Sequence, residues 1–144
     1  MNVRRVTSKE ADQAWLEAFV ARAGGVAGTV HRIEGEILAL AAAHRIPPPV
    51  VALTAQIPRG KGMAGLAWER EKPVQTCNLK DDQSGDVRPG AKAVAAQAAV
   101  ALPIRSQAGG VMAVVGVAYA DERELGEDTL KQLTLDAEAY LRQD

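Results

Sequence analysis

Aromatic and cysteine side chains are scarce in this sequence of 144 residues. Phe, Trp and Tyr together make up 3% of the chain, and there is one cysteine. Proteins that bind single-stranded nucleic acid stack the bases on aromatic side chains, so this composition excludes such a platform. One cysteine excludes an intramolecular disulfide, and with only two histidines the sequence argues against a zinc site. We expect no metal site, and we also expect no cofactor.

An excess of charge of one sign and a long hydrophobic run are also missing. The formal net charge is −1, which argues against a strongly basic surface for nucleic acid. The longest apolar stretch, residues 111–120, has about half the length of a membrane span. The N-terminus has no apolar run typical of a signal peptide. We expect a cytoplasmic protein that binds neither nucleic acid nor membrane.

Small aliphatic residues are what the chain has in abundance, with 27 Ala and 15 Val. The length fits one compact domain and not two. A domain of this size buries enough surface to fold without disulfides or metals. We expect residues 1–144 to form a single domain, with a folded core over about residues 8–142 that is built from small side chains.

The periodicity of apolar residues predicts an α+β fold with a central antiparallel sheet. Helical spacing and caps indicate a helix between Thr7 and Gly24, and a second helix that begins near Glu127. Pro47–Pro49 is expected to be an extended connector, and residues 50–58 fit either a short helix or a strand. The remaining predicted elements are strands at 26–34, 36–43 and 73–79, a short helix at 63–71, and a hairpin of strands at 98–105 and 111–119.

A glycine-rich motif occupies residues 60–65. Gly60, Gly62 and Gly65 fit the G-x-G-x-x-G pattern, in which backbone N–H groups cradle a phosphate at a helix N-terminus. The helix that follows ends before Pro73, which is too short to cross back over a sheet. A structural role, as a turn that leads into a short helix, is therefore favoured over nucleotide or phosphate binding.

Two further features have both a structural and a functional interpretation. Cys77 lies in a predicted strand, where it is either a buried small hydrophobe or a reactive thiol activated by neighbouring lysines. The polar segment 80–92 is either a surface loop or a lid over a ligand, in which Asp82, Arg88 and Lys92 would contact polar groups. The paired carboxylates at 121–124 are typical of a solvated junction between strand and helix.

The order of several motifs resembles that of a GAF domain. Ile57–Ala67 resembles the family's "IP-x-G-x-G-x-x-G-x-A" segment, and Lys72–Val74 and Asn78–Leu79 resemble the start and end of its following strand. Ala99–Ile104, followed by Val115–Val117, resembles the family's "LPV" and "GVL" hairpin. The resemblance spans nearly all of residues 8–142.

The resemblance implies a sheet of about six strands, with the N- and C-terminal helices packed on one face. A loop and a short helix would roof a ligand pocket on the other face, with Trp68, Cys77, Arg88 and Gln97 at that pocket. It also implies a dimer seam on the terminal helices, for which we select residues at helical spacing: Ala11, Trp15, Phe19, Leu130, Leu133, Ala137 and Leu141.

The chain departs from several specialised branches of the family. The N-K-F-D-E signature of cyclic-nucleotide binding is absent, and Cys77 is followed by Asn78 where bilin-attaching members have histidine. The branch that reduces free methionine sulfoxide uses several cysteines. We therefore expect a non-enzymatic, dimeric sensor or adaptor that binds a small molecule or a partner protein. The alternatives are a redox enzyme or sensor that uses Cys77 and, less favoured, phosphate binding at Gly60–Gly65.

Overall fold

The computed structural model describes residues 8–76 and 96–142. Helices are interspersed with strands along the chain, and two pairs of successive strands form hairpins. The elements are α1 (Ser8–Ala23), β1 (Ala27–Glu34), β2 (Ile37–His44), α2 (Pro48–Leu53), β3 (Gln56–Pro58), α3 (Gly62–Arg70), β4 (Val74–Thr76), β5 (Ala98–Arg105), β6 (Val111–Tyr119) and α5 (Glu127–Leu141).

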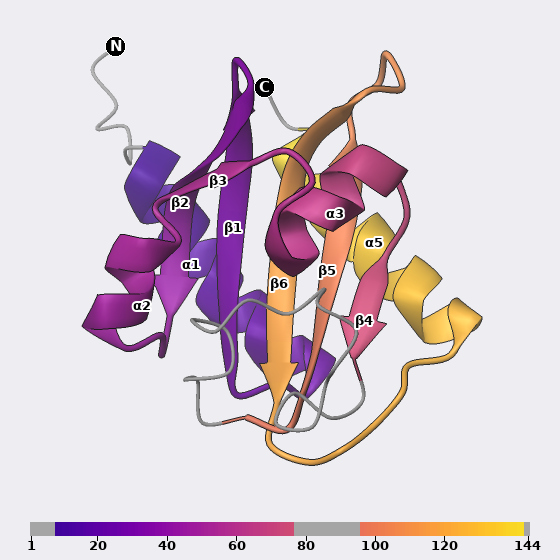
Figure 1. The fold of residues 1–144 in the computed structure, drawn as a ribbon. Helices are drawn as coiled ribbons and strands as arrows, with labels where there is room; N and C mark the ends of the chain where they lie inside the picture. The colour runs from indigo at the N-terminus through magenta and orange to yellow at the C-terminus, as the bar shows by residue number, and fades with distance from the viewer. Residues whose placement is uncertain (1–7, 77–95, 143–144) are drawn as a thin grey trace, which may run out of the picture.

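The six strands form one antiparallel sheet in the order β3-β2-β1-β6-β5-β4. The two long hairpins, β1–β2 and β5–β6, meet where β1 pairs with β6, so these four strands form its centre. Figure 1 shows α1 and α5 behind the sheet, and α2 and α3 in front of it. The predicted α+β architecture with six antiparallel strands is confirmed.

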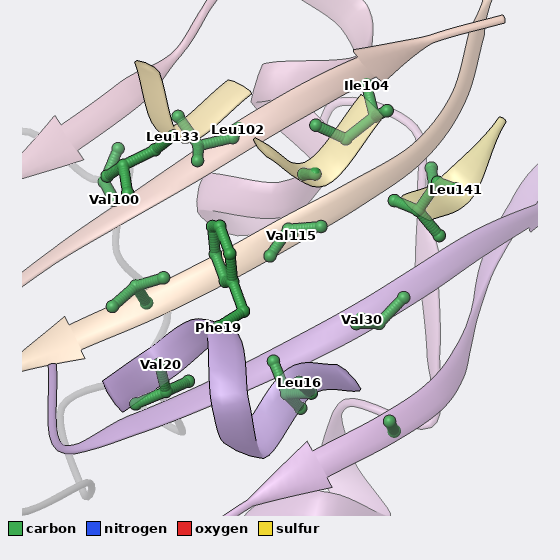
Figure 2. Packing of buried hydrophobic residues seen from close by; sticks show 14 of the residues in the cluster. Leu16, Phe19, Val20, Val30, Val100, Leu102, Ile104, Val115, Leu133 and Leu141 are labelled. Carbon is green, nitrogen blue, oxygen red and sulfur yellow. The ribbon is translucent and has the colours of Figure 1, made fainter. Parts of the chain in front are cut away.

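The face of the sheet under α1 and α5 carries one continuous hydrophobic core. Figure 2 shows Leu16 and Phe19 of α1 directed at the strands, with Leu133 and Leu141 of α5 beside them. Alternate residues of β5 and β6 supply the opposite wall, because side chains on a strand point to the two faces in turn. Those strand residues are Ala98, Val100, Leu102, Ile104, Ala113, Val115, Val117 and Tyr119.

The proline run was predicted wrongly as an extended connector. Pro48 and Pro49 form the first turn of α2, and Pro47 is its N-cap residue with φ −56° and ψ 139°. Proline is tolerated in a first turn because the N–H groups there have no partner within the helix. The ambiguous segment that follows contains both structures in succession, a short helix and then the three residues of β3. The predicted strand at 73–79 is described only as far as Thr76.

Candidate ligand site

The face of the sheet under α2 and α3 is packed differently from the other face. Among residues 8–76 and 96–142, the buried residues on this face form two separate clusters, and the half-buried Met63 packs against both. The α2 cluster consists of Ala27, Val50, Ala96 and Ala118. The α3 cluster consists of Leu38, Ile57, Ala67, Trp68, Val74, Ala101 and Val114.

Small side chains occupy the central strands on this face. Thr29 of β1 lies opposite Gly116 of β6, and Ala99 of β5 packs against the α2 cluster. All three are half-buried although they lie on central strands. A Cβ atom built on Gly116 would lie 2.9 Å from Thr29 Oγ1, so these two positions face the same side of the sheet. We call Thr29, Ala99 and Gly116 the sheet floor.

His31 adds a buried polar group next to the sheet floor. It lies two residues beyond Thr29 on β1, and only 2% of its surface is exposed. Nε2 lies 2.8 Å from the carbonyl oxygen of Thr54, the C-cap residue of α2. Nδ1 has no hydrogen-bond partner among residues 8–76 and 96–142. Burial lowers the pKa of His31 below 6.5, so the neutral ring is favoured at physiological pH.

Two of the six predicted ligand contacts fall within the described residues. Trp68 is 8% exposed and belongs to the α3 cluster, and the guanidinium carbon of Arg59 lies 5.4 Å from the centroid of its ring. Gln97 is half-buried, and its backbone N–H donates to the carbonyl oxygen of Tyr119 at 2.8 Å. The other four predicted contacts lie outside the described residues: Cys77, Asp82, Arg88 and Lys92.

The glycine motif uses its amide groups internally. The N–H of Gly60 donates to the carbonyl oxygen of Gly65, and the N–H of Gly65 donates to that of Lys61. A Cβ atom at Gly65 would lie 2.6 Å from the carbonyl oxygen of Pro58, so glycine is needed for close packing of the loop. This geometry favours a structural role for the motif over phosphate binding.

Four residues of the predicted dimer seam are buried within a single chain. Phe19, Leu133, Ala137 and Leu141 are each at most 9% exposed and belong to the core under α1 and α5. These side chains pack against the sheet, so they cannot line a surface between two copies while the core stays closed. The remaining seam residues are half-buried: Ala11, Trp15 and Leu130.

Buried polar residues are what the sequence interpretation missed on the α1 side. Asp12 is 1% exposed, and Arg32 donates to its two carboxylate oxygens at 2.9 and 2.8 Å. The hydroxyl of Tyr140 also donates to Asp12, at 2.7 Å. Burial alone would raise the pKa of Asp12, but these hydrogen bonds and the charge of Arg32 lower it below 3.8. An aspartate on the apolar face of a helix was the only signal in the sequence.

Clusters of metal-ligating side chains and membrane-spanning helices are absent from the part of the chain that the structure describes. Within residues 8–76 and 96–142, no three His, Cys, Asp or Glu side chains gather as ligands for a metal ion. Over the same residues, every helix is too short or too polar to span a bilayer.

The paired carboxylates at 121–124 lie between β6 and α5. The carboxylate of Asp121 accepts from Arg123 at 2.8 and 2.6 Å, as expected of a surface junction.

Comparison with known proteins identifies a family over most of the chain. Residues 7–139 match the model of the GAF domain. No curated protein matches the sequence.

Solved structures share the fold at low sequence identity. A GAF domain from a phosphoenolpyruvate-protein phosphotransferase of Coxiella burnetii has a TM-score of 0.75 and 16% identity, over 96% of this chain and 83% of that one. A GAF domain from A. aeolicus in an inactive state has a TM-score of 0.67 and 18% identity, over 94% and 81%. A type II free methionine-R-sulfoxide reductase from Thermoplasma acidophilum has a TM-score of 0.68 and 16% identity, over 91% and 90%.

Proposed function

This chain belongs to the GAF domain family, whose members commonly act in signalling or ligand binding, and we propose that it is a sensory module that binds a small molecule. The ligand would lie on the sheet floor, between the α2 cluster and the α3 cluster. A sensor of this kind responds because the ligand interacts differently with two states of the protein.

The contrast between the two faces of the sheet is the observation that supports this proposal. In the part of the chain that the structure describes, one continuous core packs the face under α1 and α5, whereas two clusters pack the face under α2 and α3. The three residues of the sheet floor are small, and they stay half-buried at the centre of the sheet. A small molecule with an apolar body would complete the packing there.

A substitution that fills the sheet floor tests the proposal. Ala99→Leu adds a branched side chain on the face where Ala99 packs against the α2 cluster. Native mass spectrometry of protein purified from its own host is expected to detect a bound small molecule in the wild type and none in Ala99→Leu. Ala139→Leu, on the exposed side of α5, is the matched control and should retain the ligand. Equal occupancy in Ala99→Leu would contradict the site, and a bound protein in place of a small molecule would favour an adaptor.

We also propose that the protein forms a homodimer through the outer side of α5. Leu135 is 49% exposed and lies in a shallow groove of about 520 Å³ between α5 and the residues that precede β4. The groove is lined by Lys72, Pro73, Glu127, Leu130, Lys131, Thr134, Leu135 and Glu138. An antiparallel pairing of two α5 helices centred near Leu135 would place Lys131 of each copy near Glu138 of the other, so the surface is self-complementary.

A thiol-dependent reductase is the second candidate, because free methionine-R-sulfoxide reductases share the fold. With one cysteine in the chain, the thiolate of Cys77 would take the oxygen of the sulfoxide and one proton from solvent to become a sulfenic acid, releasing methionine. An external thiol would then form a mixed disulfide with Cys77 and release water. A second external thiol would attack that bond, releasing the external disulfide and restoring the Cys77 thiol.

An assay with free methionine-R-sulfoxide and dithiothreitol separates this candidate from the sensor. Methionine formation by the wild type that Cys77→Ala abolishes would favour the reductase. Equal background rates in the two proteins would contradict the reductase.

A further inference from the structure

The proton on the ring of His31 can be assigned from its one hydrogen bond. Nε2 lies 2.8 Å from the carbonyl oxygen of Thr54, and a carbonyl oxygen can only accept. Nε2 must therefore carry a proton. Burial lowers the pKa of His31, so the ring is neutral near pH 7 and carries no second proton. Nδ1 is then a bare acceptor, with a lone pair in the plane of the ring.

This acceptor is buried without a partner among the described residues. Only 2% of the His31 surface is exposed, and Nδ1 makes no hydrogen bond within residues 8–76 and 96–142. A buried polar atom without a partner destabilises the folded protein, and native proteins satisfy most of them. A hydrogen-bond donor for Nδ1 must therefore come from outside these residues.

The strand position of His31 places this residue next to Thr29 of the sheet floor. Along this face of β1, Ala27 belongs to the α2 cluster and Ile33 packs against the α3 cluster. Thr29 and His31 are the residues between them on the same face, because side chains alternate along a strand. His31 is thus the buried polar residue of β1 at the boundary of the two clusters.

We propose that His31 selects ligands that present an N–H or O–H donor to its Nδ1 atom. The ligand class is a small molecule with an apolar body and a donor group such as an amide, an amine or a hydroxyl. A deprotonated carboxylate or phosphate oxygen has no proton to donate and would be repelled by the lone pair. This inference rests on the proposed function, because it names the chemistry that the same site would recognise.

Three related compounds separate the donor from size and charge. Propionamide carries N–H donors, propionate is similar in size but has none at pH 7, and N,N-dimethylpropionamide is neutral without a donor. Binding is followed by NMR, using the amide signals of Thr29, Ala99 and Gly116 and the ring nitrogens of His31. We expect propionamide to bind about tenfold more tightly than either analogue. It should also be the only one that shifts Nδ1.

The two histidines of the chain provide a matched pair of variants. His31→Leu should reduce the affinity for propionamide to that of the analogues, whereas His44→Gln, at a half-buried position of β2, should leave it unchanged. If His31→Leu does not fold, the Nδ1 signal of the wild type decides the question alone.

Each outcome separates this inference from the proposed function. If all three compounds shift the floor amides equally and leave Nδ1 unmoved, the donor rule is wrong while the site stands. A protonated Nδ1, or an Nδ1 held by a water that no compound displaces, would also overturn the donor rule. If no compound shifts the amides of the sheet floor, the site itself is wrong, and the proposed function fails with it.

Discussion

His31 and Asp12 are both buried, but their surroundings favour the neutral form of His31 and the charged form of Asp12. His31 meets one backbone carbonyl, so burial dominates and the neutral ring is favoured. Asp12 meets Arg32 and the hydroxyl of Tyr140, and these partners outweigh the cost of burial, so the carboxylate is favoured. Which form of a buried side chain is stable therefore depends on whether its partner groups outweigh the effect of burial, as they do for Asp12 and do not for His31.

His31 predicts a loss of stability in mild acid. Its pKa is below 6.5 in the folded chain and returns to about 6.5 in the unfolded chain, so the unfolded chain binds a proton first as the pH falls. The contribution of His31 to stability is complete above pH 6.5 and declines below it. Urea unfolding at several pH values between about 8 and 5 should show this decline.

A variant of His31 assigns the effect. His31→Gln should flatten the pH dependence of the free energy of unfolding in this window. Asp12 does not interfere, because its pKa is lowered from 3.8 and its contribution is lost only in stronger acid. An unchanged slope in His31→Gln would show that another group titrates.

At the scale of elements, α1 is attached to the rest of the fold by a polar anchor as well as by its apolar face. Asp12 joins α1 to Arg32 of β1 and to Tyr140 of α5. Trp15 stacks between two rings, with centroids 4.6 Å from Phe19 and 4.9 Å from Tyr140. The position of α1 therefore depends on one strand and one helix that lie far apart in the sequence.

Removal of this anchor should be costly. Asp12→Ala removes two hydrogen bonds from Arg32 and one from Tyr140, all made to a charged carboxylate, and we expect a loss of about 3 kcal/mol in the free energy of unfolding. Tyr140→Phe removes one hydrogen bond but keeps the ring stack, so we expect a loss of about 1 kcal/mol. Denaturant unfolding of the two variants measures both values. Equal losses would mean that the ion pair contributes little.

At the scale of the whole molecule, the outer side of α5 should decide whether two copies associate. Leu135→Glu places a charge in the groove beside α5 and should convert a dimer to a monomer without unfolding it, since Leu135 is 49% exposed. Leu53→Glu is the matched control, because Leu53 of α2 is 65% exposed on the opposite side of the sheet. Light scattering gives the mass of each variant.

Two results would contradict the proposed dimer surface. A wild type that is monomeric at all concentrations would remove the dimer, and a mass that falls only in Leu53→Glu would move the interface to α2. Substitution of Leu133 would be uninformative, because that side chain is 9% exposed and belongs to the core.

The elements and their order could be predicted from local patterns, whereas parts of the site could not. Alternating apolar residues predicted β5 and β6, and the spacing from Leu130 to Leu141 predicted α5. Pro47–Pro49 was interpreted wrongly because proline excludes a helix interior but suits a first turn. His31 was not selected as a site residue because its significance depends on Thr54, which lies 23 residues away in the sequence.

The sequence by itself determined the family and the architecture of this protein. Hydrophobic periodicity and the positions of glycines act over a few residues, so they can be recognised without knowing how the chain packs. Only the tertiary structure decided which apolar faces are free. It buried Leu133 and Ala137 of the predicted seam between α5 and the sheet, left Leu135 exposed, and left Nδ1 of His31 without a hydrogen-bond partner among residues 8–76 and 96–142. Exposure and missing partners depend on how distant segments pack, and no local pattern records that.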